Sequence, residues 1–192
     1  VVTSDIPDKP FKFGDFSLTF YNTALDDERL HGQGENAESV GTMVEKGKKS
    51  AFLAADITRT TGLEGLLLPQ LHTVDLLKVG HHGSSTSSSE EFIAAVSPQL
   101  AVISVGEGNS YGHPHQEVLD RLKDIGAAVY RTDESGTIVC RSDGTSVTFE
   151  TENGKKPTAT PRKGKADGYV GNMKSKKFHL STCSNAQDIQ QD

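Results

Sequence analysis

The regular alternation of apolar runs and helical patterns between residues 74 and 131 constrains the fold more than any other feature. Three apolar runs have the length and composition of buried strands: 74–79, 100–105 and 128–131. Two helical patterns separate them. The first is expected to start from a capping box made by Ser88 and Glu91, and the second runs from Pro114 to a cap at Gly126. Strands that alternate with helices predict an α/β fold, in which helices pack against a sheet.

The residues on either side of this region predict further strands and a linker. A short helix is expected over 61–70, and strands are expected over 16–21, 39–45, 50–55, 137–140 and 145–149. Lys, Pro, Thr and Gly dominate residues 151–168, which predicts a flexible linker. The chain is therefore expected to divide into a folded domain over 1–150, the linker, and a short separate motif over 169–192.

The charge is distributed unevenly over these parts. Residues 1–150 carry 22 Asp and Glu against 12 Lys and Arg, a net charge of −10, whereas residues 151–192 carry 4 against 8, a net charge of +4. An acidic domain argues against unspecific binding of nucleic acid over its whole surface and suits a domain that holds cations. The basic end could contact phosphate, but a solvated linker is the simpler interpretation.

The sequence has no apolar run long enough for a transmembrane segment and no signal peptide. It begins at Val1 without Met, close to an expected strand, so we interpret it as a processed or excised piece of a longer protein. Its two cysteines, Cys140 and Cys183, lie in different segments, which argues against a disulfide framework.

Polar clusters follow three of the apolar strands. Asp56 follows the expected strand 50–55, His81 and His82 follow 74–79, and His113 and His115 lie in the loop after 100–105. If the strands are neighbours, the clusters meet at one edge of the sheet. Imidazole and carboxylate groups that converge are typical ligands of zinc, manganese or iron. Each residue alone is more simply explained as a cap or a core histidine, but together they favour a metal site.

His113 has a different character from the other histidines. It lies directly before Pro114 and the helix that follows, and the start of a helix attracts anions. His113 could therefore bind a phosphate or protonate a leaving group. A plain turn at the start of the helix is an equally good interpretation.

Several motifs in order resemble one protein family. Residues 53–57 (LAADI) are similar to the fourth metallo-β-lactamase motif, in which an Asp follows a strand. Residues 75–84 (DLLKVGHHGS) and 109–115 (NSYGHPH) resemble the DVLKVxHHGS and NxYGHP runs of the ComEC-like subgroup of that superfamily. The resemblance covers roughly residues 11–140.

The resemblance implies an αββα sandwich, of which residues 1–150 are the C-terminal part, with one or two zinc or manganese ions at the sheet edges. It implies that Asp56 bridges two metals and that His81 or His82 binds the second, with His81 slightly favoured. His113 and His82 are the expected catalytic side chains. The expected reaction is hydrolysis of a phosphodiester by a metal-bound hydroxide, with DNA or another phosphoester as substrate and with a role in competence and DNA uptake.

Two departures from the family pattern put activity in doubt. The HxHxDH motif that supplies most ligands of the first metal is absent from this chain and is expected upstream of Val1. The usual third-motif histidine is not evident either, because His31 matches it poorly. We therefore expect these 192 residues alone to be inactive, with a missing N-terminal half of the domain as their partner and a full-length hydrolase as the parent.

The C-terminal motif has a resemblance of its own. Residues 169–172 (YVGN), 175–179 (SKKFH) and Cys183 are similar to small Ada-type metal-binding segments appended to secreted nucleases and hydrolases of Gram-positive bacteria. His179 and Cys183, one helical turn apart, could share a metal. A small mini-domain or a partly disordered end is an equally good interpretation. The resemblance implies an extracellular or cell-surface location.

The sequence is compatible with three functions. The first is a metal-dependent nuclease or related hydrolase. The second is a binding module whose degenerate site holds DNA or a cell-surface polymer without cutting it. The third is a structural half-domain that completes a membrane-associated competence protein.

Overall fold

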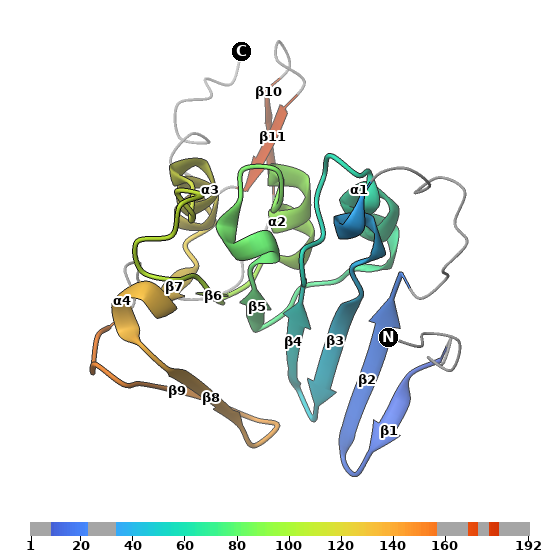
Figure 1. The fold of residues 1–192 in the computed structure, drawn as a ribbon. Helices are drawn as coiled ribbons and strands as arrows, with labels where there is room; N and C mark the ends of the chain where they lie inside the picture. The colour runs from blue at the N-terminus through green and yellow to red at the C-terminus, as the bar shows by residue number, and fades with distance from the viewer. Residues whose placement is uncertain (1–8, 23–33, 157–168, 173–176, 181–192) are drawn as a thin grey trace.

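A computed structural model describes residues 9–22, 34–156, 169–172 and 177–180 (Figure 1). Its centre is a seven-stranded sheet in which the strands follow one another in sequence order. The strands are β1 (Phe11–Phe13), β2 (Phe16–Tyr21), β3 (Gly41–Lys46), β4 (Lys49–Leu53), β5 (Leu76–Lys78), β6 (Leu100–Ile103) and β7 (Ala128–Arg131). The pairs from β1 to β4 are antiparallel, and those from β4 to β7 are parallel. The expected α/β class is confirmed.

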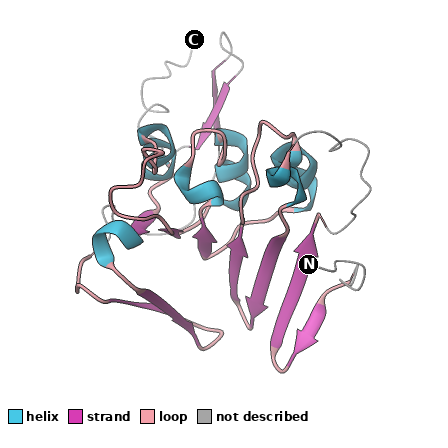
Figure 2. Ribbon diagram, in the orientation of Figure 1, coloured by secondary structure: helices cyan, strands magenta, loops and turns pink. Residues whose placement is uncertain are grey.

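Helices α1 (Leu63–Leu67), α2 (Glu90–Val96) and α3 (Gln116–Asp124) occupy the connections between the parallel strands, and α4 (Thr132–Ser135) follows β7 (Figure 2). Short 3-10 helices lie at Glu35–Glu38, before β3, and at Leu68–Gln70 and Gly80–Gly83. In the described part of the chain no helix combines the length and the apolarity that crossing a membrane requires.

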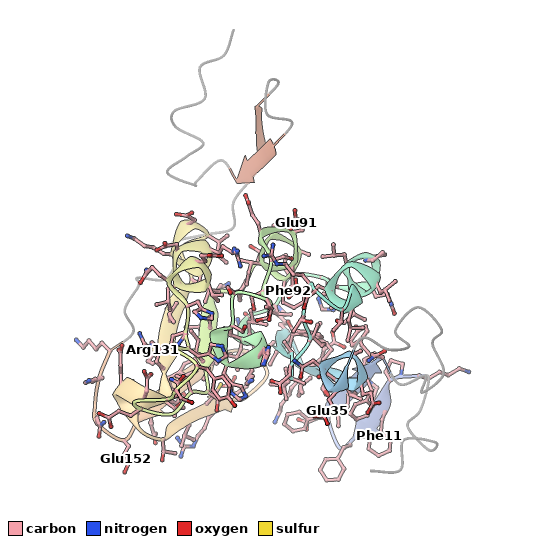
Figure 3. The ribbon with its side chains drawn as sticks, turned by 45° about the horizontal axis from the view of Figure 1, so that its top comes forward. Phe11, Glu35, Glu91, Phe92, Arg131 and Glu152 are labelled. Atoms are coloured by element: carbon pink, nitrogen blue, oxygen red, sulfur yellow. The ribbon has the colours of Figure 1, made fainter. Side chains whose placement is uncertain are left out.

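The main core lies between one face of the sheet and helices α1 to α3. Phe52, Leu77, Ala101 and Val129 are neighbours in register on β4 to β7, and each is at most 3% exposed. Phe92 of α2 packs its ring 5.9 Å from that of Phe52. Figure 3 shows Phe92 directed into the molecule and the adjacent Glu91 directed away from it. The amphipathic helices therefore bury their apolar sides on this face.

The expected cap of α2 is wrong by one residue. The side chain of Ser89, not Ser88, accepts a hydrogen bond from Phe92 N–H at 3.2 Å, so Ser89 caps the helix. Ser88 is instead buried, and its hydroxyl has no hydrogen-bond partner. Pro114 was expected to be the first residue of the next helix but lies before it, because α3 begins at Gln116 with His115 as its cap.

Two hairpins form small sheets separate from the large one. One is β8 (Ile138–Ser142) with β9 (Val147–Thr151), and the other is β10 (Tyr169–Asn172) with β11 (Lys177–Leu180). The first confirms the hairpin expected over 137–149, shifted by one or two residues. The linker expected over 151–168 lies mostly outside the described residues, because residues 157–168 are not described.

Candidate functional site

The polar residues that follow the parallel strands gather at one edge of the sheet, as the strand order requires. Asp56 follows β4, His81 and His82 lie in the Gly80–Gly83 segment directly after β5, and His113 and His115 lie between β6 and α3. Backbone hydrogen bonds connect these segments: His81 N–H donates to the carbonyl of Ala55 at 2.9 Å. The sequence-based expectation that the three clusters meet is therefore consistent with the geometry.

His82 and Asp56 form the closest acid–histidine pair of this edge. His82 Nε2 lies 3.6 Å from Asp56 Oδ1. The other ring nitrogen, Nδ1, lies 2.7 Å from the carbonyl oxygen of Ser104, which can only accept a hydrogen bond. In the neutral ring Nδ1 therefore carries the hydrogen, and the lone pair of Nε2 faces the carboxylate. Two acceptors that face each other are satisfied by a cation, a proton or water between them, and both of these side chains are partly exposed.

The other histidines of this edge, His81, His113 and His115, form a cluster beside this pair. The ring centroids of His81 and His113 are 5.7 Å apart, and those of His113 and His115 are 4.9 Å apart. His115 Nδ1 accepts a hydrogen bond from Ser85 N–H at 2.8 Å, which leaves Nε2 as its proton-bearing nitrogen in the neutral ring. His81 Nδ1 is 3.5 Å from the hydroxyl of Thr86. His82 therefore contacts Asp56, while His81 belongs to the cluster.

The backbone around the pair adopts conformations that few residues tolerate. Ala55, His81 and His82 have φ of 46°, 46° and 55°, in the left-handed region. Each such residue costs about 1–3 kcal/mol and persists only where the surrounding structure enforces it. Gly83, at φ of 81°, has no room for a side chain, because an added Cβ would lie 2.5 Å from Pro114 Cβ. Left-handed conformations and close packing thus fix the backbone at His81 and His82.

The segment after the histidines is held by charged side chains from two helices. Both carboxylate oxygens of the buried Glu64 of α1 accept backbone N–H groups, those of Ser88 and, at 3.0 Å, Ser89. Arg121 of α3 donates to the carbonyl of Ser88 at 3.1 Å. Burial raises the pKa of Glu64, although the hydrogen bonds from Ser89 and Ser88 and the charge of Arg121 oppose this. The two helices fix the segment that carries the site.

The loop before α3 is fixed by one asparagine. Asn109 Oδ1 accepts His113 N–H at 3.0 Å, and its amide nitrogen donates to the carbonyl of His113 at 2.7 Å. Tyr111, which is 76% exposed, stacks on the His113 ring at 5.7 Å. Desolvation lowers the pKa of His113, and the charges of His115, His81 and His82 add to this. His113 is therefore neutral at neutral pH.

Lys78 is a charged neighbour of the pair that the sequence did not single out. It is the last residue of β5, and its pKa is lowered by burial, an effect that the nearby charge of Asp56 opposes. A lysine in an otherwise apolar strand gives no signal of its own in the sequence. Its proximity to Asp56 depends on the pairing of β4 with β5.

The donors at this edge suit a metal ion but do not complete a site. Zinc ligands lie about 2.0–2.2 Å from the ion, so two ligands of one ion lie roughly 3–4 Å apart, as Asp56 and His82 do. A metal-bound histidine also characteristically donates its other N–H to a carbonyl, as His82 does to Ser104. Within the described residues, however, no group of three or more His, Cys, Asp or Glu side chains is arranged to hold a metal. A catalytic zinc needs three protein ligands.

The remaining candidates are His179, Cys183 and His31. His179 is in strand β11, so the argument from helical spacing with Cys183 does not apply to it. Cys183 and His31 lie outside the described residues.

Comparison with known proteins gives relatives for part of the chain. No family model matches the chain. It is 41% identical over 107 residues, 56% of its length, to ComE operon protein 3 of Bacillus subtilis. It is 37% identical over 106 residues to Recombination protein 2 of Haemophilus influenzae, and 49% identical over 63 residues to Competence protein ComA of Neisseria gonorrhoeae. The matched segments span 14%, 13% and 9% of these relatives' own lengths.

Proposed function

Because its relatives indicate a competence-related family, we propose that this chain is part of a metal-dependent hydrolase of the metallo-β-lactamase superfamily that cleaves phosphodiester bonds of DNA during DNA uptake. The observation that carries the proposal is the pair of Asp56 and His82, in which the carboxylate oxygen lies 3.6 Å from Nε2 while Nδ1 lies 2.7 Å from a backbone carbonyl. Zinc or manganese suits this combination of oxygen and nitrogen donors. A bacterial cell-surface or extracellular location is part of the proposal.

In this proposal the chain supplies only part of the active site. Asp56 and His82 are two ligands, and the others come from residues beyond the described ones, in an N-terminal half of the same domain. When bound, such an ion polarises a phosphoryl oxygen and lowers the pKa of water. The strained backbone at His81 and His82 and the bonds of Glu64 and Arg121 hold the ligands in place beforehand.

His113 has a role that follows from its protonation state. Since its pKa is lowered, the neutral ring donates one N–H and carries no permanent charge at neutral pH. This favours a hydrogen bond to a phosphoryl oxygen of the substrate over storage of a proton for the leaving group. Tyr111, stacked on the ring and largely exposed, offers a flat surface beside the same position.

Hydrolysis of bis-p-nitrophenyl phosphate with added Mn²⁺ or Zn²⁺ tests the proposal. We expect no activity from the 192-residue chain, and EDTA-sensitive activity from a longer gene product that contains it. Asp56→Ala should abolish this activity, whereas Asp120→Ala, an exposed aspartate on α3, should leave it unchanged. Activity of the 192-residue chain would refute the partial site. A folded but inactive longer protein would refute the hydrolase.

The described residues provide no third metal ligand beside Asp56 and His82, and this favours a second function. A degenerate module that binds DNA or a cell-surface polymer without cutting it requires no complete metal site. Fluorescence anisotropy with labelled DNA distinguishes the two functions: binding by the longer protein without metal and without cleavage would support the module. The charge of −10 on residues 1–150 opposes such binding in the absence of metal.

A further inference from the structure

The carbonyl that orients His82 is one end of a peptide group whose other end is bound as well. This peptide group joins Ser104 to Val105. Its carbonyl oxygen lies 2.7 Å from His82 Nδ1, and its N–H, on Val105, donates a hydrogen bond to Thr132 Oγ1 at 2.7 Å. Because a peptide group is planar and stiff, its two ends move together. Thr132 is therefore connected to His82 through a single peptide plane.

The hydroxyl of Thr132 takes over where the pairing of β6 with β7 ends. The last pair of these strands joins Ile103 to Arg131, so Val105 lies beyond the paired residues. Thr132 Oγ1 accepts the N–H of Val105 and donates its hydrogen to the carbonyl of the same residue at 2.7 Å, while the carbonyl of Ile103 is further away, at 3.5 Å. A hydroxyl can do both, because it has one hydrogen and two lone pairs. A single side chain thus fixes both polar backbone groups of Val105.

Thr132 itself is held in place as the first residue of α4, between β7 and the β8–β9 hairpin (Figure 1). Arg131, directly before it, binds two carboxylates of this helix: Asp133 Oδ1 lies 3.1 Å from its Nε, and Glu134 Oε1 lies 3.0 Å from its Nη1. Asn153, after the hairpin, donates from its side-chain amide to the carbonyl of Glu134 at 3.3 Å. These bonds fix α4 from both ends, so the position of Thr132 does not depend on His82.

The orientation of His82 needs such support because its ring is not buried. The side chain is 47% exposed, so water competes for Nδ1. Hydrogen bonds in a chain polarise one another, so the bond that Val105 donates to Thr132 strengthens the carbonyl of Ser104 as an acceptor. The same bond keeps that carbonyl directed at the ring. Both effects favour the arrangement in which Nδ1 carries the hydrogen and the lone pair of Nε2 faces Asp56.

We propose that Thr132 is a positioning residue of the candidate site, which acts on His82 through the Ser104–Val105 peptide and so presents the lone pair of Nε2 to Asp56. The consequence for the ring follows from the hydrogen bonds alone. The consequence for metal binding rests on the proposed function. Loss of the partners that orient a metal-bound histidine typically lowers metal affinity about 10–100-fold.

The position of the hydrogen on the His82 ring tests the first consequence. Nitrogen NMR of the imidazole rings in the 192-residue chain, without metal and at about pH 8, where histidine is ordinarily neutral, distinguishes a hydrogen on Nδ1 from one on Nε2. We expect the Nδ1 form in the wild type. Thr132→Val keeps the shape of the side chain and removes the hydroxyl, so the ratio of the Nδ1 form to the Nε2 form should fall about fivefold, as for one weakened hydrogen bond. An unchanged ratio, or a wild-type ring with its hydrogen on Nε2, would overturn the proposal.

Further variants separate the hydroxyl from other effects of the substitution. Thr132→Ser keeps the hydroxyl and should keep the wild-type ratio. Thr137→Val is the matched control, since the hydroxyl of Thr137 donates to Glu152 at 2.9 Å, and it should also leave the ratio unchanged. Thr132→Ser and Thr132→Ala both lack the methyl group and differ only in the hydroxyl, so this pair carries the test if Thr132→Val does not fold. Equal falls in Thr132→Val and Thr137→Val would contradict a specific role of Thr132.

Zinc affinity of the longer gene product tests the second consequence. A competition titration with a coloured chelator should show affinity about 10–100-fold weaker in Thr132→Val and unchanged in Thr132→Ser and Thr137→Val. Unchanged affinity in Thr132→Val would overturn the role in metal binding. A folded longer protein that binds no zinc would refute the proposed function instead, and the NMR measurement on the 192-residue chain would still decide whether Thr132 positions His82.

Discussion

The two faces of the large sheet differ in how far they are covered: helices bury one face, whereas much of the opposite face, here called the open face, is exposed. On the helix side Phe52, Leu77 and Ala101 are fully buried, and the buried carboxylate of Glu64 accepts two backbone N–H groups. On the open face Phe13 and Leu53 are exposed, and the β8–β9 hairpin covers only a part, where Phe149 stacks on Tyr130. The same strands provide both faces, so the contrast comes from what packs on them. The candidate site lies at the edge of this sheet, where its ligand set is incomplete as well.

The largest expected difference between the two sides is in the cost of truncating adjacent residues. Phe52→Ala removes a fully buried ring and should lower the free energy of unfolding by about 3–5 kcal/mol. Leu53→Ala, next to it on the open face, should cost less than about 1 kcal/mol in the 192-residue chain, since much of its side chain is already in water. Urea unfolding of both variants measures this. Similar costs would show that the open face is already packed.

A smaller difference is expected within the helix side, between two adjacent serines. Ser89→Ala removes the cap of α2 and should cost about 1 kcal/mol. Ser88→Ala removes a buried hydroxyl that has no partner, so it should be neutral or slightly stabilising. Thermal or urea unfolding compares the two variants. A cost for Ser88→Ala equal to that of Ser89→Ala would show that Ser88, as the sequence pattern suggested, is the cap.

The smallest effect is a pair of opposite pH dependences, one from each side of the sheet. Burial raises the pKa of Glu64, so its contribution to stability is present below its unfolded pKa and is lost as the pH rises through the folded value. Hydrogen bonds from Ser146 and Thr145 lower the pKa of Asp143 in the β8–β9 turn, so its contribution is present above the unfolded pKa and is lost as the pH falls.

Comparing each variant with the wild type at several pH values isolates these two groups. The destabilisation by Glu64→Gln should shrink as the pH rises from 4 to 7, and that by Asp143→Asn should shrink as the pH falls below about 4, toward the lowered pKa of Asp143. Urea unfolding between pH 3 and 7 provides the measurement. The same direction of change for both variants would contradict the assignment of Glu64 to a desolvated environment.

The sequence predicted the strands of this sheet except β1, and it predicted the edge at which the candidate residues gather. Residues 16–21 and 128–131 are strands with the expected bounds, because their apolar patterns are unambiguous. The gathering of Asp56, His82 and His113 at one edge follows from the order of parallel strands alone.

Contacts between distant parts of the chain could not be predicted. The orientation of His82 depends on a carbonyl 22 residues away, and the buried bonds of Glu64 join positions 24 and 25 residues apart. No local pattern encodes such partners. The exposure of the open face was not predicted, for another reason. A short apolar run predicts a strand that is buried on both faces, and it does not tell whether the layer that covers each face belongs to this chain.

Metal content, measured by mass spectrometry on the purified longer protein and its variants, tests the central claim that Asp56 and His82 hold one ion. The account predicts stoichiometric zinc or manganese in the wild type and loss of one ion in both Asp56→Ala and His82→Ala. It predicts that His81→Ala, a change in the neighbouring histidine cluster, retains that ion. Full metal content in Asp56→Ala and His82→Ala, or no metal in the wild type after incubation with Mn²⁺ and Zn²⁺, would contradict it.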